Sequence, residues 1–351
     1  MGDMVKSGVD TANGVREDIP WTEVMEFSCV LVNCQIQGML PEFDLPLWAD
    51  YNANSLLRVT LRPLTSKEKQ EYLLPSFGER TTLPVLSCSV VLCHADATGE
   101  ISVNALVSAR EWLLRCLRLL KPDFLWMTYR PLHHVFDWDV LHSVRIPPVE
   151  LRRRDIENLR QLMACFRRTG LGLHETEILS HKWIRIMALG MKERRKARSL
   201  YREVALSAFE RANEHGPHYV DCLADFIVAL EALYLHETDE LSYRLGNRVA
   251  TLLGQSAKRR AEIQDEVRSF YRDRNYLIHG TAKLLSYKYD VGQLREHVRR
   301  SLLYHIALEG SGKETIIEEL DRSLFRTLGA RQLREMCHRF YGSKLAVALR
   351  L

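Results

Sequence analysis

Three residues near the end of one helical segment combine side chains that suit chemistry at a phosphate group. Arg274 and Asn275 are adjacent, and His279 follows Asn275 by four positions. An imidazole, whose unperturbed pKa is about 6.5, can accept or donate a proton near neutral pH. A guanidinium offers a rigid fork of donors that fits phosphate oxygens. An amide can hydrogen-bond the same phosphate or hold the histidine in one tautomer. These residue types in this spacing predict metal-independent chemistry at a phosphate ester.

The residues around this motif resemble a known family. Residues 271–280 hold an Arg-x4-His pattern followed by glycine, and two apolar helical segments, 226–233 and 242–250, precede it. Together the three segments resemble HEPN domains, in particular their Apea-like branch, where an Arg-x(4–6)-His pattern ends a helix. The resemblance covers residues 219–308. It implies an all-α HEPN bundle with its core at about 215–310.

The resemblance also implies a function. It suggests an endoribonuclease that cleaves RNA, tRNA included, at a composite site across a homodimer, with Arg274, Asn275 and His279 as catalytic residues. The implied role is that of a toxin-like effector of antiviral defence that acts through abortive infection. Two alternatives remain open: a catalytically inactive HEPN module for dimerisation, RNA binding or regulation, and a protein-interaction scaffold.

A helical wheel of residues 259–279 places Arg274 within an apolar stripe. At roughly 100° per residue, the stripe contains Ile263, Val267, Phe270, Tyr271, Leu277 and Ile278. A guanidinium on a core-facing stripe is costly unless an anion lies beside it. We therefore expect Arg274 to meet a carboxylate or a phosphate, and Glu231 on the preceding apolar helix is a candidate.

The wheel puts the other motif residues on the adjoining face. Asn275 and His279 are four apart and therefore neighbours, together with Arg268 and Arg272. Arg274 and His279 differ in direction by about 140°, too much for both to point at one spot on a straight helix. Two such helices that meet across a two-fold axis would bring the two edges face to face. The wheel thus favours a composite site in a homodimer.

RNA supplies its own nucleophile for such a site, the ribose 2′-hydroxyl. The protein must take that proton, stabilise the phosphorane and protonate the leaving 5′-oxygen. Two copies of His279 can divide the proton transfers between them, while Arg274 binds the non-bridging oxygens. We expect no metal and no cofactor, because the sequence lacks a carboxylate-rich cluster and His/Cys ligand spacing.

Several of these residues also have an ordinary structural interpretation. Gly280 directly after His279 is typical of a helix C-terminus, and a histidine in a last turn is favoured by the helix dipole. Arg248 falls on the core stripe of its own helix. A buried ion pair between Glu231 and Arg248, bracing the site, is the expected supporting contact.

Basic residues cluster in the second half of the chain. Lys258, Arg259 and Arg260 follow one another, and other basic clusters lie at 152–154 and 192–198. With Arg268 and Arg272, the first cluster is a candidate surface for RNA phosphates. A net charge of +4 is too small to identify a nucleic-acid binder by itself, and solvated helix faces are the alternative.

The elements that position the motif belong to a predicted α+β chain. Residues 1–20 are polar and aperiodic, which predicts a disordered tail. Residues 21–148 predict a β-rich or mixed α/β domain of unknown role. This domain is a candidate regulator, or a candidate sensor of a viral or host trigger. Two prolines at 147–148 mark the boundary.

Beyond this boundary, 149–351 predicts an α-helical domain. Its helices are expected near 150–167, 174–190, 193–213, 218–235, 240–254, 258–279, 291–308, 313–327 and 330–339. In the first domain we expect strands at 27–32, 56–61, 84–92 and 124–129, and a helix at 103–120.

The cysteines and the apolar runs favour a cytoplasmic protein. The chain has eight cysteines but no Cys-x-x-Cys pair, so we expect them to be reduced and buried. No apolar stretch is long enough to cross a bilayer, and the amino terminus lacks a signal peptide's apolar region. We expect no membrane attachment.

Overall fold

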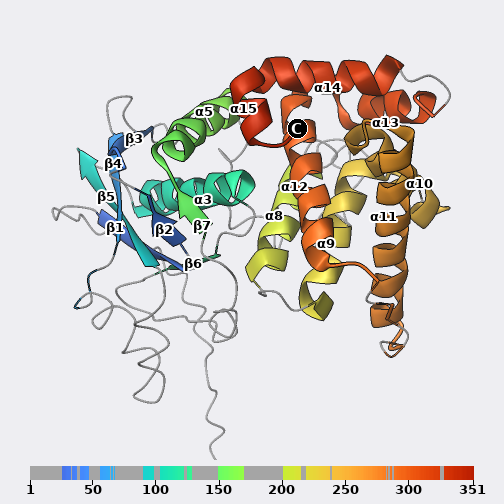
Figure 1. Ribbon diagram of the computed structural model, residues 1–351, viewed down its shortest axis with the longest axis horizontal. Coiled ribbons are helices and arrows are strands. Elements are labelled where there is room, and N and C mark those ends of the chain that lie inside the picture. Colours follow the sequence, from blue (N-terminus) through green and yellow to red (C-terminus); the bar gives the residue numbers. More distant parts are fainter. Residues whose placement is uncertain are drawn as a thin grey trace, which may run out of the picture.

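The small sheet and two helices beside it lie at one end of the molecule, and the other helices extend away from it (Figure 1). The computed structural model describes residues 26–32, 34–37, 40–46, 56–63, 65, 67, 90–98, 103–121, 125–128, 149–169, 201–214, 219–237, 239–281, 283, 285–286, 288–324 and 328–351. The tail predicted at 1–20 lies outside these residues, as do the helix predicted at 174–190 and the first part of the one predicted at 193–213. In the described part, no helix is both long and apolar enough to cross a membrane.

The sheet has five antiparallel strands in the order β3-β4-β5-β1-β6. These are β1 (Glu26–Val32), β3 (Phe43–Pro46), β4 (Leu56–Pro63), β5 (Val90–Thr98) and β6 (Leu125–Thr128). The strands predicted at 27–32, 56–61 and 124–129 are confirmed. The one predicted at 84–92 is described only from Val90, and it continues to Thr98.

A two-stranded parallel pair joins distant parts of the chain. β2 (Cys34–Ile36) pairs with β7 (Val149–Leu151), and Cys34 lies opposite Val149. The helical part was predicted to begin at residue 149, so a strand there is a difference from the sequence analysis. The two prolines before it end any preceding helix but do not prevent an extended segment after them.

Two helices belong to this half of the molecule, one between β5 and β6 and one after β7. α3 (Val103–Leu120) has the bounds that its periodicity predicted. α5 (Arg153–Thr169) packs along it, with the rings of Trp112 and Phe166 5.8 Å apart and Lys121 3.1 Å from Asp155. Residues 149–169 therefore contact the elements of the first half, although the pattern grouped them with the later helices.

The remainder of the described chain is helical. The helices are α8 (Tyr201–Glu214), α9 (Tyr219–Tyr234), α10 (Leu241–Leu253), α11 (Ala257–Ile278), α12 (Val291–Ala307), the short 3-10 helix η3 (Glu309–Ser311), α13 (Lys313–Arg322), α14 (Leu328–Tyr341) and α15 (Ser343–Ala348). α12 runs through the middle of this group (Figure 1), and most of its side chains from Leu294 to Ile306 are buried. The predicted helices that fall on described residues are confirmed in type, but α13 ends at Arg322, before the predicted end at 327, and α15 was not predicted.

One arginine of α12 connects α3, which lies beside the sheet, with the C-terminal helix α15. Arg299 is buried and donates to the backbone oxygen of Leu119 at 2.7 Å and to that of Leu349 at 2.8 Å. It therefore supplies donors to carbonyls at the C-terminal ends of both α3 and α15, which lack partners within their own helices. A second buried contact, Arg118 to Glu210 at 3.2 Å, joins α3 to α8.

Candidate active site

The motif lies on the last turns of α11, a helix with clear stop and start signals. Ser256 caps its beginning by accepting a hydrogen bond from the Arg259 backbone N–H at 3.2 Å. His279 is the C-terminal cap, and its backbone N–H donates to the backbone oxygen of Asn275 at 3.0 Å. Gly280 then takes a φ of 69°, a left-handed conformation that glycine adopts without strain. The ordinary interpretation of Gly280 as a helix terminator is confirmed.

Arg274 faces Glu231 across the contact between α11 and α9. Its Nη2 lies 3.6 Å from the Glu231 Oε2, which is within ion-pair range but longer than a hydrogen bond. Its Nη1 donates to the Asn275 Oδ1 at 3.2 Å, and its buried Nε has no hydrogen-bond partner among the described residues. The expectation that Arg274 needs an anion is confirmed, and the anion in this chain is Glu231. Because Nε is buried, a phosphate would have to approach this guanidinium through its two terminal nitrogens.

Tyr271 completes the surroundings of Arg274. The Arg274 guanidinium carbon lies 5.8 Å from the centre of the Tyr271 ring. Burial raises the pKa of Tyr271, and the charge of Glu231 and a hydrogen bond to it raise that pKa further. Glu231 thus contacts both a phenol and a guanidinium, which holds the two helices in register beside the motif.

His279 lies one helical turn beyond Asn275 and is exposed. Its imidazole has no hydrogen-bond partner among the described residues. The neighbouring Ile278 is 57% exposed, so its expected place on the core-facing stripe was wrong, whereas Leu277 packs against the core. The apolar stripe of α11 continues to Ile278 in the sequence, but the end of α11 extends beyond the core, so Ile278 has no core residues to pack against in the described part of the chain. Within one chain, His279 is therefore an exposed imidazole beside an exposed apolar side chain.

Asp273 is a neighbour of the motif that the sequence analysis missed. It is completely buried and accepts hydrogen bonds from the Ser286 backbone N–H at 3.1 Å and from its hydroxyl at 2.7 Å. Ser286 also lies 3.3 Å from Ser269, one turn earlier on α11. Asp273 therefore ties the segment after the motif back onto the helix. The i, i+4 spacing of Ser269 and Asp273 was the signal available in the sequence.

The predicted pair between Glu231 and Arg248 is wrong. Arg248 is buried and forms paired hydrogen bonds with Asp321, from Nε at 2.8 Å and from Nη2 at 2.7 Å. It also binds both carboxylate oxygens of Glu237, at 2.9 and 2.5 Å, and the Tyr234 backbone oxygen at 2.7 Å. Arg248 does need carboxylates, as its burial predicted, but they come from the end of α9 and from α13. It braces those helices away from the motif.

The basic residues proposed for RNA fall into two groups. Arg268 and Arg272 are exposed on α11 within three turns of His279, and Arg272 donates to the Ser269 hydroxyl at 3.2 Å. The cluster at 258–260 lies at the other end of the same helix, roughly 30 Å away at 1.5 Å per residue. Its middle member, Arg259, is paired with Glu262 at 3.0 Å and with Glu266 at 3.1 Å. Only the first group borders the motif.

Comparison of the chain with protein-family models, curated proteins and solved structures finds no match. Among the described residues, no group of three or more histidine, cysteine or acidic side chains is arranged to hold a metal ion. Five described cysteines, Cys34, Cys116, Cys165, Cys222 and Cys337, are buried thiols that form no disulfide, as expected. The chemistry of the site must therefore be argued from its own residues.

Proposed function

We propose that the end of α11 is the active site of a metal-independent endoribonuclease, completed when two chains form a homodimer. The observation that carries the proposal is the state of Arg274. It lies on the same helix end as the exposed imidazole of His279, its guanidinium is 3.6 Å from a carboxylate, and its buried Nε has no hydrogen-bond partner among the described residues. A phosphate would bind Arg274 more strongly than Glu231 does at this distance. Paired guanidinium–phosphate hydrogen bonds are short and charge-assisted, whereas the contact with Glu231 is longer than a hydrogen bond.

In the proposed mechanism the 2′-oxygen of a ribose attacks the adjacent phosphorus. One His279 removes the 2′-hydroxyl proton, and the second His279 of the dimer protonates the 5′-oxygen as its bond to phosphorus breaks. The products are a 2′,3′-cyclic phosphate and a free 5′-hydroxyl. Arg274 binds the non-bridging oxygens, and Asn275, already bonded to it, fixes the orientation of the guanidinium.

The surface around the motif supports a second copy as the partner. One chain contributes one imidazole, whereas the mechanism uses two. Ile278 exposes an apolar side chain directly beside His279, where a two-fold contact would cover it. The helical part is accordingly proposed to be a HEPN bundle, with RNA, tRNA among the candidates, as substrate. A role in antiviral defence and a regulatory role for the N-terminal part rest on the resemblance alone.

The deciding experiment incubates the purified chain with a mixed RNA pool in chelator and analyses the ends of the products. We expect cyclic 2′,3′-phosphate ends, lost in His279→Ala and in Arg274→Ala. His236→Ala, which removes another exposed histidine, is the matched control and should cleave normally. A strict requirement for Mg²⁺ would overturn the proposal. RNA binding without cleavage would favour the inactive module, and no binding even at low salt would favour the scaffold.

A further inference from the structure

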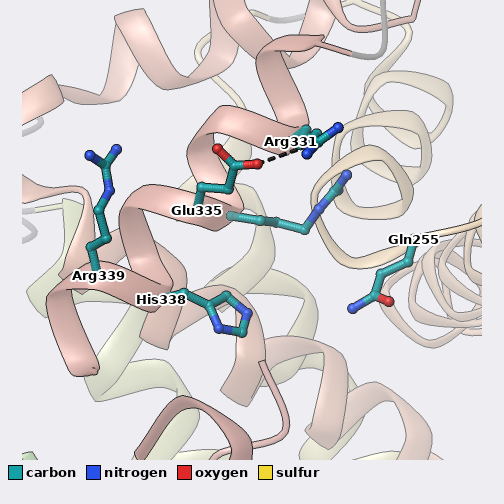
Figure 2. Close-up of a pocket in the computed structure, with 6 residues that line it drawn as sticks. Gln255, Arg331, Glu335, His338 and Arg339 are labelled. Atoms are coloured by element: carbon teal, nitrogen blue, oxygen red, sulfur yellow. Dashed lines mark hydrogen bonds and ion pairs between the residues drawn. The ribbon is translucent and has the colours of Figure 1, made fainter. Parts of the chain in front are cut away.

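A basic pocket lies at the end of α11 opposite the motif. It is an open hollow of about 600 Å³ lined by Gln255, Arg331, Arg334, Glu335, His338 and Arg339. All but Gln255 come from one face of α14, while Gln255 lies in the turn between α10 and α11. Figure 2 shows the side chains of Gln255 and His338 reaching toward each other across this space. α11, whose 22 residues span about 33 Å, runs from the Gln255 side of the pocket to the end of the motif.

The guanidinium groups of the pocket outnumber its carboxylates. Glu335 is the only acidic residue in the lining, and it is already paired with Arg331 at 2.8 Å (Figure 2). Arg339 forms no ion pair with any described residue. Arg334 donates to the backbone oxygens of Thr251 and Leu252, at 2.9 and 3.2 Å, and to no carboxylate in the described part of the chain. Two positive charges of the lining therefore lack a negative partner among the described residues.

Two further arginines add to this charge from behind the pocket. Arg300 donates to the Leu253 backbone oxygen at 3.4 Å, and its buried Nε has no hydrogen-bond partner in the part of the chain that the structure describes. Arg260 packs over Gly254, where an added Cβ would lie 2.5 Å from its Cγ. Burial lowers the pKa of Arg334, and the nearby charges of Arg260 and Arg300 lower it further. Three cations thus surround the C-terminal end of α10.

The end of α10 does not account for so many cations. Its carbonyl groups carry roughly half a negative charge, and one arginine more than balances that. The positive end of α11 also begins at this turn, since Ser256 directly follows Gln255, and it offsets the negative end of α10. A surplus of positive charge remains around a hollow that opens to solvent.

We propose that this pocket binds a small molecule that carries a chain of phosphate groups. Guanidinium forks match phosphate oxygens, and several of them suit adjacent phosphates better than a single one. The volume lies within the range of small-molecule sites and exceeds what one phosphate fills. The Gln255 amide and the His338 ring offer hydrogen bonds to whatever group the phosphate chain carries.

The surroundings of the pocket favour a small ligand over an RNA strand. α13 packs against α14 and carries four acidic residues and two basic ones, with Glu314 and Glu318 exposed. An extended polyanion that continues past the pocket in this direction meets these carboxylates. A compact phosphate chain within the pocket avoids them.

The test measures binding to the full chain by calorimetry in magnesium-free buffer, with orthophosphate, tripolyphosphate and adenosine triphosphate as probes. We expect tripolyphosphate to bind at least about tenfold more tightly than orthophosphate, and Arg339→Glu to weaken it by about tenfold or more. Arg160→Glu, the same charge change at an exposed position of α5, is the matched control and should leave binding unchanged. Arg331→Glu is a second pocket variant with an exposed side chain, and thermal melting without ligand checks that each variant is folded.

Comparison of tripolyphosphate with adenosine triphosphate identifies the source of the phosphate chain. Tighter binding of adenosine triphosphate than of tripolyphosphate indicates a nucleotide, and equal binding indicates recognition of the phosphate chain alone. The proposal is overturned if no probe binds, or if both pocket variants bind as the unaltered chain does. It is also overturned if an RNA oligonucleotide displaces tripolyphosphate and binds more tightly, since the site is then an RNA surface.

Discussion

Replacing Arg248 by methionine tests the view that this arginine joins three helices. Methionine keeps much of the side-chain volume but removes five hydrogen bonds, two to Asp321, two to Glu237 and one to the Tyr234 backbone oxygen. Breaking a buried ion pair by removing one partner typically costs about 3–5 kcal/mol, because the other charge is left uncompensated. Here Asp321 is 42% exposed and Glu237 20% exposed, so water can solvate them in part. We therefore expect a loss near about 3 kcal/mol.

The assay is urea denaturation followed by far-ultraviolet circular dichroism. Arg244→Ala is the matched control, because Arg244 lies on the same helix and pairs with the same Glu237, at 3.4 Å, but is 38% exposed. Its removal should lower the free energy of unfolding by less than about 1 kcal/mol. If Arg248→Met is no more destabilising than Arg244→Ala, the inference that burial makes this network important is wrong.

The same variant has a predicted dependence on pH. The hydrogen bonds from Arg248 hold the pKa of Glu237 well below its usual range. A carboxylate whose pKa is lower in the folded state stabilises the fold above its unfolded pKa, about 4.3, and this stabilisation is lost as the pH falls. The difference in free energy of unfolding between the unaltered chain and Arg248→Met should therefore shrink on acidification below about pH 4. A difference that stays constant with pH would contradict this explanation.

Three further predictions concern the motif helix and its neighbours. Glu231→Gln removes the anion that competes for Arg274, so RNA should bind more tightly by a few-fold in fluorescence anisotropy; weaker binding would mean that the carboxylate positions the guanidinium. Asp273→Ala removes both hydrogen bonds to Ser286 and should cost about 2 kcal/mol, with faster hydrogen exchange at 283–290; unchanged exchange would refute the tie. Tyr234→Phe removes one buried hydrogen bond of 2.8 Å and should cost about 1 kcal/mol in urea denaturation, and an unchanged midpoint would show that the hydroxyl contributes nothing.

The helices around the motif were predictable because their signals agree with one another. In α11 the apolar spacing and Gly280 after the end indicate the bounds that the structure shows. The short elements were missed for a physical reason. β2, β7 and α15 have three to six residues, fewer than are needed for a periodic pattern to repeat.

The candidate site was predictable only in part. A wheel shows that Arg274 and Arg248 need carboxylates, because burial of an unpaired charge is costly wherever it occurs. It does not show which carboxylate arrives, and Asp321 is 73 residues away from Arg248 along the chain. The exposure of Ile278 was hidden for a related reason. A helical pattern does not reveal where the neighbouring helices end.

Arg299 connects the last residues of the chain to helix α3 in the first half of the sequence. One guanidinium binds backbone oxygens beside α15 and at the end of α3, so each contact holds the arginine in place for the other. Removal of Leu349 leaves a buried donor unpaired next to α3, which couples damage at the carboxyl end to helix α3 and the sheet strands near it. Unfolding of the two halves should therefore be cooperative, and a protease that trims the carboxyl end should sensitise α3 to cleavage.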